Sequence, residues 1–212
     1  MENVIAKRNS LLASRIIDAL GRRHMKGHYA ATLAEAKDVV LSLIPEGSSV
    51  GWGGSLSLGQ IQVKDSLREG NYQLFDRDKA KDSQELDQIE RQCLATDVFL
   101  MGTNAITEDG QLVNMDGNGN RVAALAFGPQ RVIVVAGINK VCSDLDNAIK
   151  RVRHTAAPIN AFRFPGDTPC RNFGVCGDCS KDDCICSQLL ITRGSMSKDR
   201  VHVVIVGEPL GF

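Results

Sequence analysis

The stretch GTNAITEDGQLVNMDGNGNR, residues 102–121, connects two apolar runs, 98–101 and 132–136, that are typical of buried strands. A turn alone needs only about two to five residues, and this connection is long, polar and rich in glycine. Open α/β sheets bind ligands at the ends of their strands, so the stretch predicts a ligand-binding loop. The alternative is a hairpin with Asp109-Gly110 as its turn and 111–114 as a short return strand. The two interpretations are compatible if the hairpin carries function.

The rest of the chain alternates strand and helix patterns around this stretch. Apolar residues recur at helical spacing over residues 2–25, 33–43, 77–95 and 144–152. Short apolar runs near residues 28–30, 50–52, 72–76, 189–192 and 201–206 predict strands. This order predicts an α/β fold, a twisted and mostly parallel sheet flanked by helices. We expect one domain over residues 1–212, with a Cys-rich insertion at about 168–188.

Composition excludes several classes of protein. The chain has 25 Lys and Arg against 25 Asp and Glu, so it lacks the basic field that nucleic-acid binding requires. One Trp and two Tyr make a base-stacking platform improbable as well. No run of 18 apolar residues is present, and the N-terminal residues lack the apolar core of a signal peptide, so we expect no membrane span and a cytoplasmic protein.

A second glycine-rich segment, Gly51-Trp52-Gly53-Gly54-Ser55, follows the strand predicted near Val50. Exposed backbone N–H groups at such a strand-to-helix turn favour a phosphate or a carboxylate. No Gly-Lys-Ser/Thr and no G-x-G-x-x-G pattern occurs here, so neither a Walker loop nor a dinucleotide fold is indicated. Tight packing alone is the alternative explanation of these glycines.

Five of the seven cysteines fall within residues 170–186, in the order C-x5-C-x2-C-x4-C-x-C. Cys176 and Cys179 have chelate spacing, and Cys170 with either Cys184 or Cys186 would complete four sulfur ligands. Tetrahedral sulfur suits zinc or an iron–sulfur cluster. Structural or redox disulfides are the alternative, which a cytosolic setting disfavours.

The segments Val50–Ser55, Gly102–Gly110 and Gly117–Ala124 together resemble the LUD-domain family of the LutC/YkgG lactate-utilisation type. The Cys-rich segment resembles the short subtype of that family, in which Cys170, Cys176, Cys179 and Cys186 fall on the cysteine positions and Cys184 is extra. The resemblance implies a fold similar to the NagB/RpiA/CoA-transferase-like group. It also implies a role in oxidation of lactate to pyruvate together with iron–sulfur partner proteins, without establishing catalysis by this chain.

The resemblance and the two glycine-rich segments together predict a site for a small anionic substrate. Arg121 would pair with a carboxylate, and Glu108 or Asp109 would act as a general base. The expected ligand-binding residues are Gly51, Gly53, Gly54, Ser55, Thr103, Asn104, Asn114, Asp116, Gly117, Asn118, Gly119, Asn120 and Arg121. One alternative is an isomerase or CoA-transferase acting on a phosphorylated or CoA-linked substrate, with Glu108 as the nucleophile. The other is a ligand-sensing module without catalysis, stabilised by the metal site.

Overall fold

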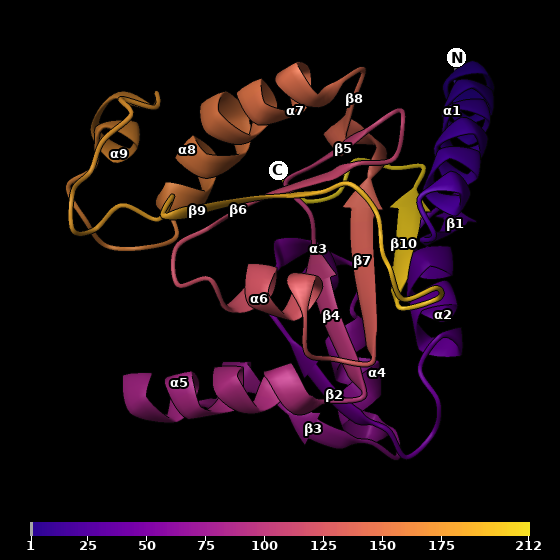
Figure 1. Ribbon diagram of the computed structural model, residues 1–212, viewed down its shortest axis with the longest axis horizontal. Coiled ribbons are helices and arrows are strands. Elements are labelled where there is room, and N and C mark those ends of the chain that lie inside the picture. Colours follow the sequence, from indigo (N-terminus) through magenta and orange to yellow (C-terminus); the bar gives the residue numbers. More distant parts are fainter. Residues whose placement is uncertain (1) are drawn as a thin grey trace.

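The computed structural model describes residues 2–212 and consists of two sheets with helices around them. The larger sheet has the strand order β1-β10-β7-β4-β2-β3, and every pair in it is parallel. Its strands are β1 (Lys26–Ala30), β2 (Ser49–Trp52), β3 (Gln73–Phe75), β4 (Val98–Gly102), β7 (Arg131–Gly137) and β10 (Val201–Val206). The predicted α/β fold with a mostly parallel sheet is confirmed, as Figure 1 shows.

Helices cover both faces of the larger sheet, which explains why its central strands are continuous apolar runs. One face packs against α1 (Glu2–Arg22) and α6 (Asn120–Ala126); the other packs against α2 (Leu33–Ser42), α3 (Leu56–Gln60) and α4 (Val63–Glu69). The sequence predicts the start of α2 correctly, because Thr32 Oγ1 accepts a hydrogen bond from Glu35 N at 3.2 Å. None of the helices in residues 2–212 combines the length and the apolarity that a bilayer crossing requires.

The smaller sheet is built on the central connection and has the order β8-β5-β6-β9. Its strands are β5 (Ala105–Thr107), β6 (Leu112–Asp116), β8 (Val141–Cys142) and β9 (Gln188–Thr192). β5 and β6 form the antiparallel hairpin that the sequence allowed, turning at residues 108–111. β9 pairs antiparallel with β6, which the strand–helix alternation did not predict, because pairing partners far apart in sequence leave no periodic signal.

Three of the remaining helices lie around the smaller sheet, while α5 (Ser83–Gln92) packs beside β3 at the edge of the larger sheet (Figure 1). The three are α7 (Leu145–Arg151), α8 (Ala157–Ala161) and α9 (Pro169–Phe173), and a π-helical turn (Val152–Ala156) joins α7 to α8. Single 3-10 turns occupy Arg77–Lys79, Cys93–Ala95 and Ile138–Lys140. The Cys-rich segment therefore leads from α9 into β9 and sits on the edge of the smaller sheet.

Candidate functional site

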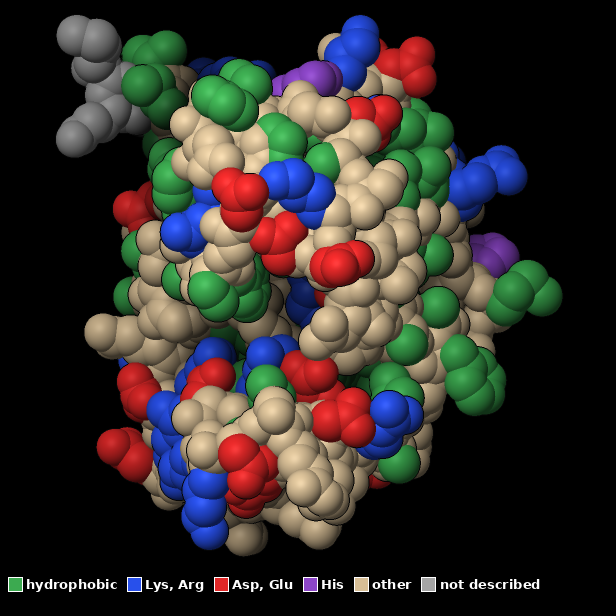
Figure 2. Space-filling view, turned by 90° about the vertical axis from the view of Figure 1, so that its left-hand side faces the viewer, with side chains coloured by type: hydrophobic (Ala, Val, Ile, Leu, Met, Phe, Trp, Pro, Cys, Tyr) green, Lys and Arg blue, Asp and Glu red, His purple; other side chains and the backbone are tan. Residues whose placement is uncertain are grey.

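A cavity of about 440 Å³ opens where three neighbouring strands of the larger sheet, β2, β4 and β7, have their carboxyl ends. β2 leads to Gly54 and Ser55, β4 leads to Thr103 and Asn104, and β7 leads to Lys140. Figure 2 shows a hollow between the α5 side of the molecule below and the Cys-rich side above, with Lys and Arg side chains in it. The site thus lies where open α/β sheets place ligands.

Arg121 is fixed in this cavity by the end of the hairpin. Its Nη2 donates to Met115 O at 2.6 Å, and its Nε lies 3.3 Å from Asp116 Oδ2. Asp116 Oδ2 also accepts from the backbone N of Arg121 at 3.1 Å, so the same carboxylate anchors the first turn of α6. A Cβ at Gly53 would lie 2.4 Å from Arg121 Cγ. Gly53 therefore leaves the space that the stem of Arg121 occupies.

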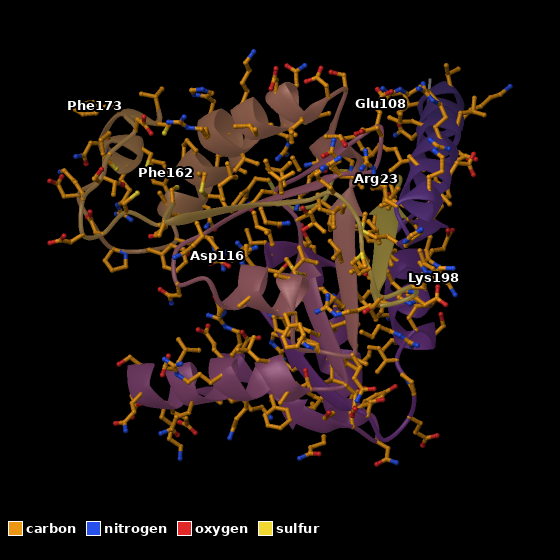
Figure 3. All side chains as sticks on the ribbon, in the orientation of Figure 1. Arg23, Glu108, Asp116, Phe162, Phe173 and Lys198 are labelled. Carbon is orange, nitrogen blue, oxygen red and sulfur yellow. The ribbon has the colours of Figure 1, made fainter. Side chains whose placement is uncertain are left out.

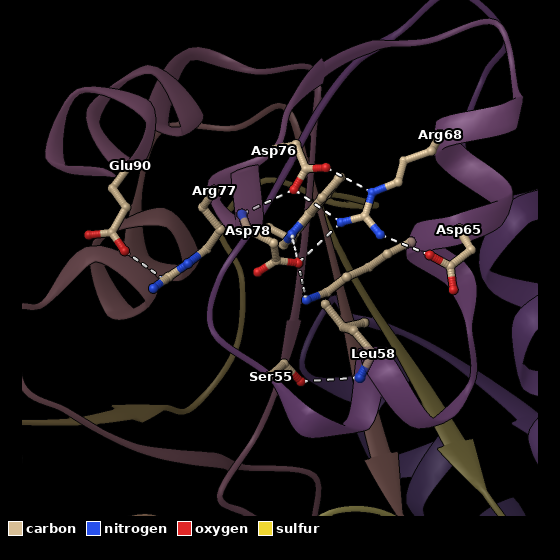
Figure 4. A network of polar contacts seen from close by, with 10 residues as sticks. Ser55, Leu58, Asp65, Arg68, Asp76, Arg77, Asp78 and Glu90 are labelled. Atoms are coloured by element: carbon tan, nitrogen blue, oxygen red, sulfur yellow. Dashed lines mark hydrogen bonds and ion pairs between the residues drawn. The ribbon is translucent and has the colours of Figure 1, made fainter. Parts of the chain in front are cut away.

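Arg77 reaches the cavity from the turn after β3. Its Nη1 pairs with Glu90 Oε1 of α5 at 2.6 Å, and burial raises the pKa of Glu90 despite that positive neighbour. The turn itself is held by Arg68, which donates to Asp76 Oδ2 at 2.8 Å, while Asp78 accepts from Lys64 Nζ at 2.7 Å, as Figure 4 shows. This polar network fixes the backbone on both sides of Arg77.

Lys140 lines the same cavity and is 4% exposed. Its Nζ donates to Ser57 Oγ at 3.0 Å. Burial, and then the positive charges of Arg151 and Arg121, lower the pKa of Lys140 to about 7. Arg163 is the fourth cationic side chain at the cavity. It reaches the cavity from the chain after α8 and donates to Asn160 Oδ1 at 3.0 Å.

Most of the residues expected from the sequence meet at this cavity. Nine of the predicted ligand-binding residues line it: Gly54, Ser55, Thr103, Asn104, Asp116, Gly117, Asn118, Asn120 and Arg121. Gly51, Gly53, Asn114 and Gly119 are not among its lining residues. A Cβ at Gly51 would lie 2.5 Å from Cys93 Sγ, so this glycine serves packing, while Asn114 is fully buried in β6.

Glu108 and Asp109, predicted as candidate bases, lie at the turn of the hairpin, whereas the cavity lies at its open end. Figure 3 shows Glu108 and Asp116 at these opposite ends. Glu108 pairs with Arg15 at 3.4 Å, and Asp109 bonds to Arg23 and Thr107. Hydrogen bonds from Thr107 and Arg23 outweigh burial and lower the pKa of Asp109, which weakens it as a base. Neither residue lines the cavity, and their catalytic role stays a prediction.

The five clustered cysteines line a second cavity, of about 180 Å³, and none of them forms a disulfide. They are Cys170, Cys176, Cys179, Cys184 and Cys186. Burial, followed by the neighbouring sulfurs, raises the pKa of Cys186 to about 12. In residues 2–212 no three His, Cys, Asp or Glu side chains stand close enough to hold one metal ion. The five thiols thus share one cavity.

Sequence reasoning missed several lining residues: Ser57, Arg77, Glu90, Lys140, Asn160, Arg163 and Asp183. Two of these carried a usable signal, because Ser57 lies two residues after the second glycine-rich segment and Lys140 follows a predicted strand. Arg163 and Asp183 lie in irregular chain, and only the tertiary fold brings them to the cavity.

Comparisons with known proteins agree with this architecture. A family model described as LUD domain matches residues 13–206. A crystal structure of a DUF162 family protein from Deinococcus radiodurans is similar over 93% of this chain and 97% of its own, with a TM-score of 0.53 and 14% identity. That likeness concerns the fold alone.

Two more distant likenesses cover about half of the chain. Ribose 5-phosphate isomerase A from Neisseria gonorrhoeae matches 53% of this chain and 53% of its own, at 15% identity and a TM-score of 0.35. The eIF2B delta structure from Chaetomium thermophilum matches 50% of this chain and 47% of its own, at 16% identity and a TM-score of 0.33. Among individually curated proteins, none matches the sequence.

Proposed function

The chain belongs to the LUD-domain family, and on that premise we propose that it binds a small organic acid in the cavity formed by β2, β4 and β7. Lactate and its oxidation product pyruvate are the acids that the LutC/YkgG resemblance suggests. In this proposal the chain is a subunit of lactate oxidation and works with iron–sulfur partner proteins. The alternative ligands are a sugar phosphate and a CoA thioester.

The observation that carries the proposal is the charge of the cavity. Four cationic side chains line it, Arg77, Arg121, Lys140 and Arg163, against three carboxylates. Glu90 and Asp116 are already paired with Arg77 and Arg121. Lys140 and Arg163 make their hydrogen bonds to a hydroxyl and an amide instead. Arg163, and Lys140 in its protonated form, therefore have no ion-pair partner among the described residues and can pair with an anion that enters the cavity.

The size of the cavity also suits a small acid. Its volume of about 440 Å³ lies at the lower end of the range for small-molecule sites, about 300–1,000 Å³. The CoA-transferase alternative requires a free glutamate at the substrate. Glu90 lines the cavity, but its carboxylate is paired with Arg77, and Glu108 is not a lining residue.

Titration calorimetry of the purified chain with lactate, pyruvate, a sugar phosphate and CoA tests the proposal. We expect the two carboxylic acids to bind and Arg163→Gln to weaken that binding about 10-fold, as loss of a charge-assisted hydrogen bond does. Arg91→Gln is the matched control, because Arg91 is exposed on α5 and pairs with Asp87. Binding of the sugar phosphate or CoA alone would favour the isomerase or transferase function instead.

For the Cys-rich segment we propose a metal centre held by Cys170, Cys176, Cys179 and Cys186. An all-thiolate set lining one cavity fits zinc or an iron–sulfur cluster chemically. The centre would supply electron transfer if it is a cluster, and stability if it is zinc.

Metal and sulfide analysis of protein purified without oxygen, with its visible spectrum, tests this centre. Iron with sulfide and a band that bleaches on reduction would support a cluster and the oxidation function. One zinc per colourless chain would support a structural site. Absence of both metals would contradict the proposal and leave free thiols or disulfides.

A further inference from the structure

We propose that Lys140 is an amine nucleophile, which forms an imine with the carbonyl group of a small 2-oxo acid in the cavity, and that Ser57 assists the proton transfers. The inference rests on the proposed function, because it takes an organic acid as the ligand of this cavity. It adds a covalent activity to a site otherwise described as a binding site.

The geometry around Lys140 is that of a reactive amine rather than of a structural ion pair. The side chain lines the cavity while only 4% of it is exposed. Its hydrogen-bond partner is the hydroxyl of Ser57, at 3.0 Å, and the charges that act on it, those of Arg151 and Arg121, are both positive. A buried lysine that served structure alone would be expected to pair with a carboxylate.

The absence of a counter-charge has a chemical consequence. Desolvation and like charges both disfavour the ammonium form, and they lower the pKa of Lys140 to about 7. At neutral pH, Lys140 is therefore a neutral amine with a free lone pair in a large fraction of the molecules. Lysines activated in this way, by desolvation or by a neighbouring cation, form imines with carbonyl compounds.

Glycines occupy two positions near the amine at which a side chain would fill part of the cavity. A Cβ at Gly211 would lie 3.0 Å from Lys140 Nζ and 2.7 Å from Ser57 Oγ. A Cβ at Gly102 would lie 3.5 Å from Ser57 Oγ and 3.0 Å from Ser55 Oγ. Both glycines line the cavity, so room for a substrate is kept beside the amine and the hydroxyl.

Arg121 and Arg163 supply the second requirement, a grip on the acid. Both line the cavity with Lys140, and the N–H groups of either guanidinium can donate to a carboxylate in a bidentate geometry. A 2-oxo acid carries its carbonyl next to its carboxylate. If an arginine holds the carboxylate, the carbonyl carbon would therefore lie near the amine of Lys140, which can be uncharged.

The step balances without an oxidant. The Nζ lone pair bonds to the carbonyl carbon as the C=O π bond breaks, and one proton passes from the nitrogen to the carbonyl oxygen to give a neutral carbinolamine. The nitrogen then gives up a proton while the hydroxyl leaves as water, so ketone and amine become imine and water. The Ser57 hydroxyl, which already contacts Nζ, is placed to pass these protons.

Borohydride trapping of the full chain tests the inference. The protein is incubated with pyruvate and sodium borohydride, which adds a hydride to the imine carbon and leaves a stable secondary amine. Peptide mapping by mass spectrometry should find the pyruvate-derived adduct on Lys140, saturating with pyruvate concentration and forming faster as the pH rises through about 7. Lactate, which has a hydroxyl in place of the ketone group, should give no adduct.

The variants separate a reactive lysine from one that only binds charge. Lys140→Arg keeps a cation and should lose the adduct, and Ser57→Ala should slow its formation about 10-fold or more. Lys150→Arg is the matched control, because Lys150 is exposed on α7 and should not change the rate. Adducts spread over surface lysines, or none on Lys140, would overturn the inference. Calorimetry on the same sample distinguishes this from failure of the proposed function, because pyruvate would then still bind.

Discussion

Ile185 lies directly beside Gly117: a Cβ added to Gly117 would be 3.5 Å from both Cα and O of Ile185. Gly117 belongs to the cavity of about 440 Å³, and Ile185 lines that cavity and the cysteine cavity alike. Met115 is also shared by the two. The residue between Cys184 and Cys186 is therefore part of the wall of the anion site.

This shared wall predicts that removing the metal weakens acid binding. If Cys186 and the other three proposed ligands hold a centre, its loss frees the chain around Ile185 and Asp183, which both line the anion cavity. Chelation under anaerobic conditions should then lower pyruvate affinity about 5-fold or more, the usual lower range of coupling between two sites. Calorimetry before and after chelation, with metal analysis of both samples, measures the effect. Equal affinity in the metal-free and loaded protein would show that the two cavities are independent.

Gly53→Ala should impair the anion site without unfolding the protein. The added Cβ would meet Arg121 Cγ at 2.4 Å, and Arg121 has a flexible side chain that can swing away from the cavity. We expect pyruvate affinity to fall about 10-fold, as for loss of a charge-assisted hydrogen bond. Gly59→Ala, in α3, is the control because nothing lies within 4 Å of its Cβ. A Gly53→Ala variant that binds as the unsubstituted chain does would mean that Arg121 is not a ligand group.

The stability of the protein should rise from pH 7 to pH 9 because of Lys140. Its folded pKa of about 7 lies below the ordinary lysine value of 10.5, so the unfolded chain binds the extra proton throughout this window. The free energy of unfolding therefore increases with pH in this window, by at most about 1.4 kcal/mol per pH unit. At a pH below both the folded and the unfolded pKa of Lys140, this residue causes no further change. Burial raises the pKa of Cys93 to about 11 and that of Cys186 to about 12, so these two thiols oppose the trend from about pH 8 upward.

Urea unfolding at pH 7, 8 and 9 measures this dependence. Lys140→Met should flatten the rise, while Lys150→Met, exposed on the neighbouring helix, should leave it unchanged. The same slope in Lys140→Met and in the unsubstituted chain would show that Lys140 remains charged in the folded protein.

Asp76→Asn should destabilise the turn that carries Arg77. The Asp76 carboxylate is 7% exposed and accepts from Arg68 Nε at 2.8 Å and from the backbone N of Asp78 at 3.1 Å. Weakening these charge-assisted bonds should cost about 1.5–3 kcal/mol of unfolding free energy. Asp65→Asn is a close control, because Asp65 pairs with the same arginine at 2.8 Å but is 70% exposed, and its loss should cost under about 1 kcal/mol. Equal losses would contradict the role of burial.

The prediction of the fold succeeded where the signal is local or periodic. Helices α1 and α2 and the apolar strands β4, β7 and β10 follow from the periodicity and length of their apolar runs. The hairpin at Asp109-Gly110 follows from turn preference. The antiparallel addition of β9 to β6 does not, because strand pairing depends on contacts between distant segments.

The sequence by itself determined the α/β class, the position of the site at the strand ends and many of its lining residues. These depend on the spacing of apolar residues and on the glycines and short polar residues of the central stretch. The tertiary structure decided which of these residues meet, moving Glu108 to the far end of the hairpin and bringing Lys140, Arg163 and Ile185 to one cavity. It also decided that Lys140 is buried among positive charges. Burial and electrostatic environment are sums over neighbours from the whole chain, so no single segment can encode them.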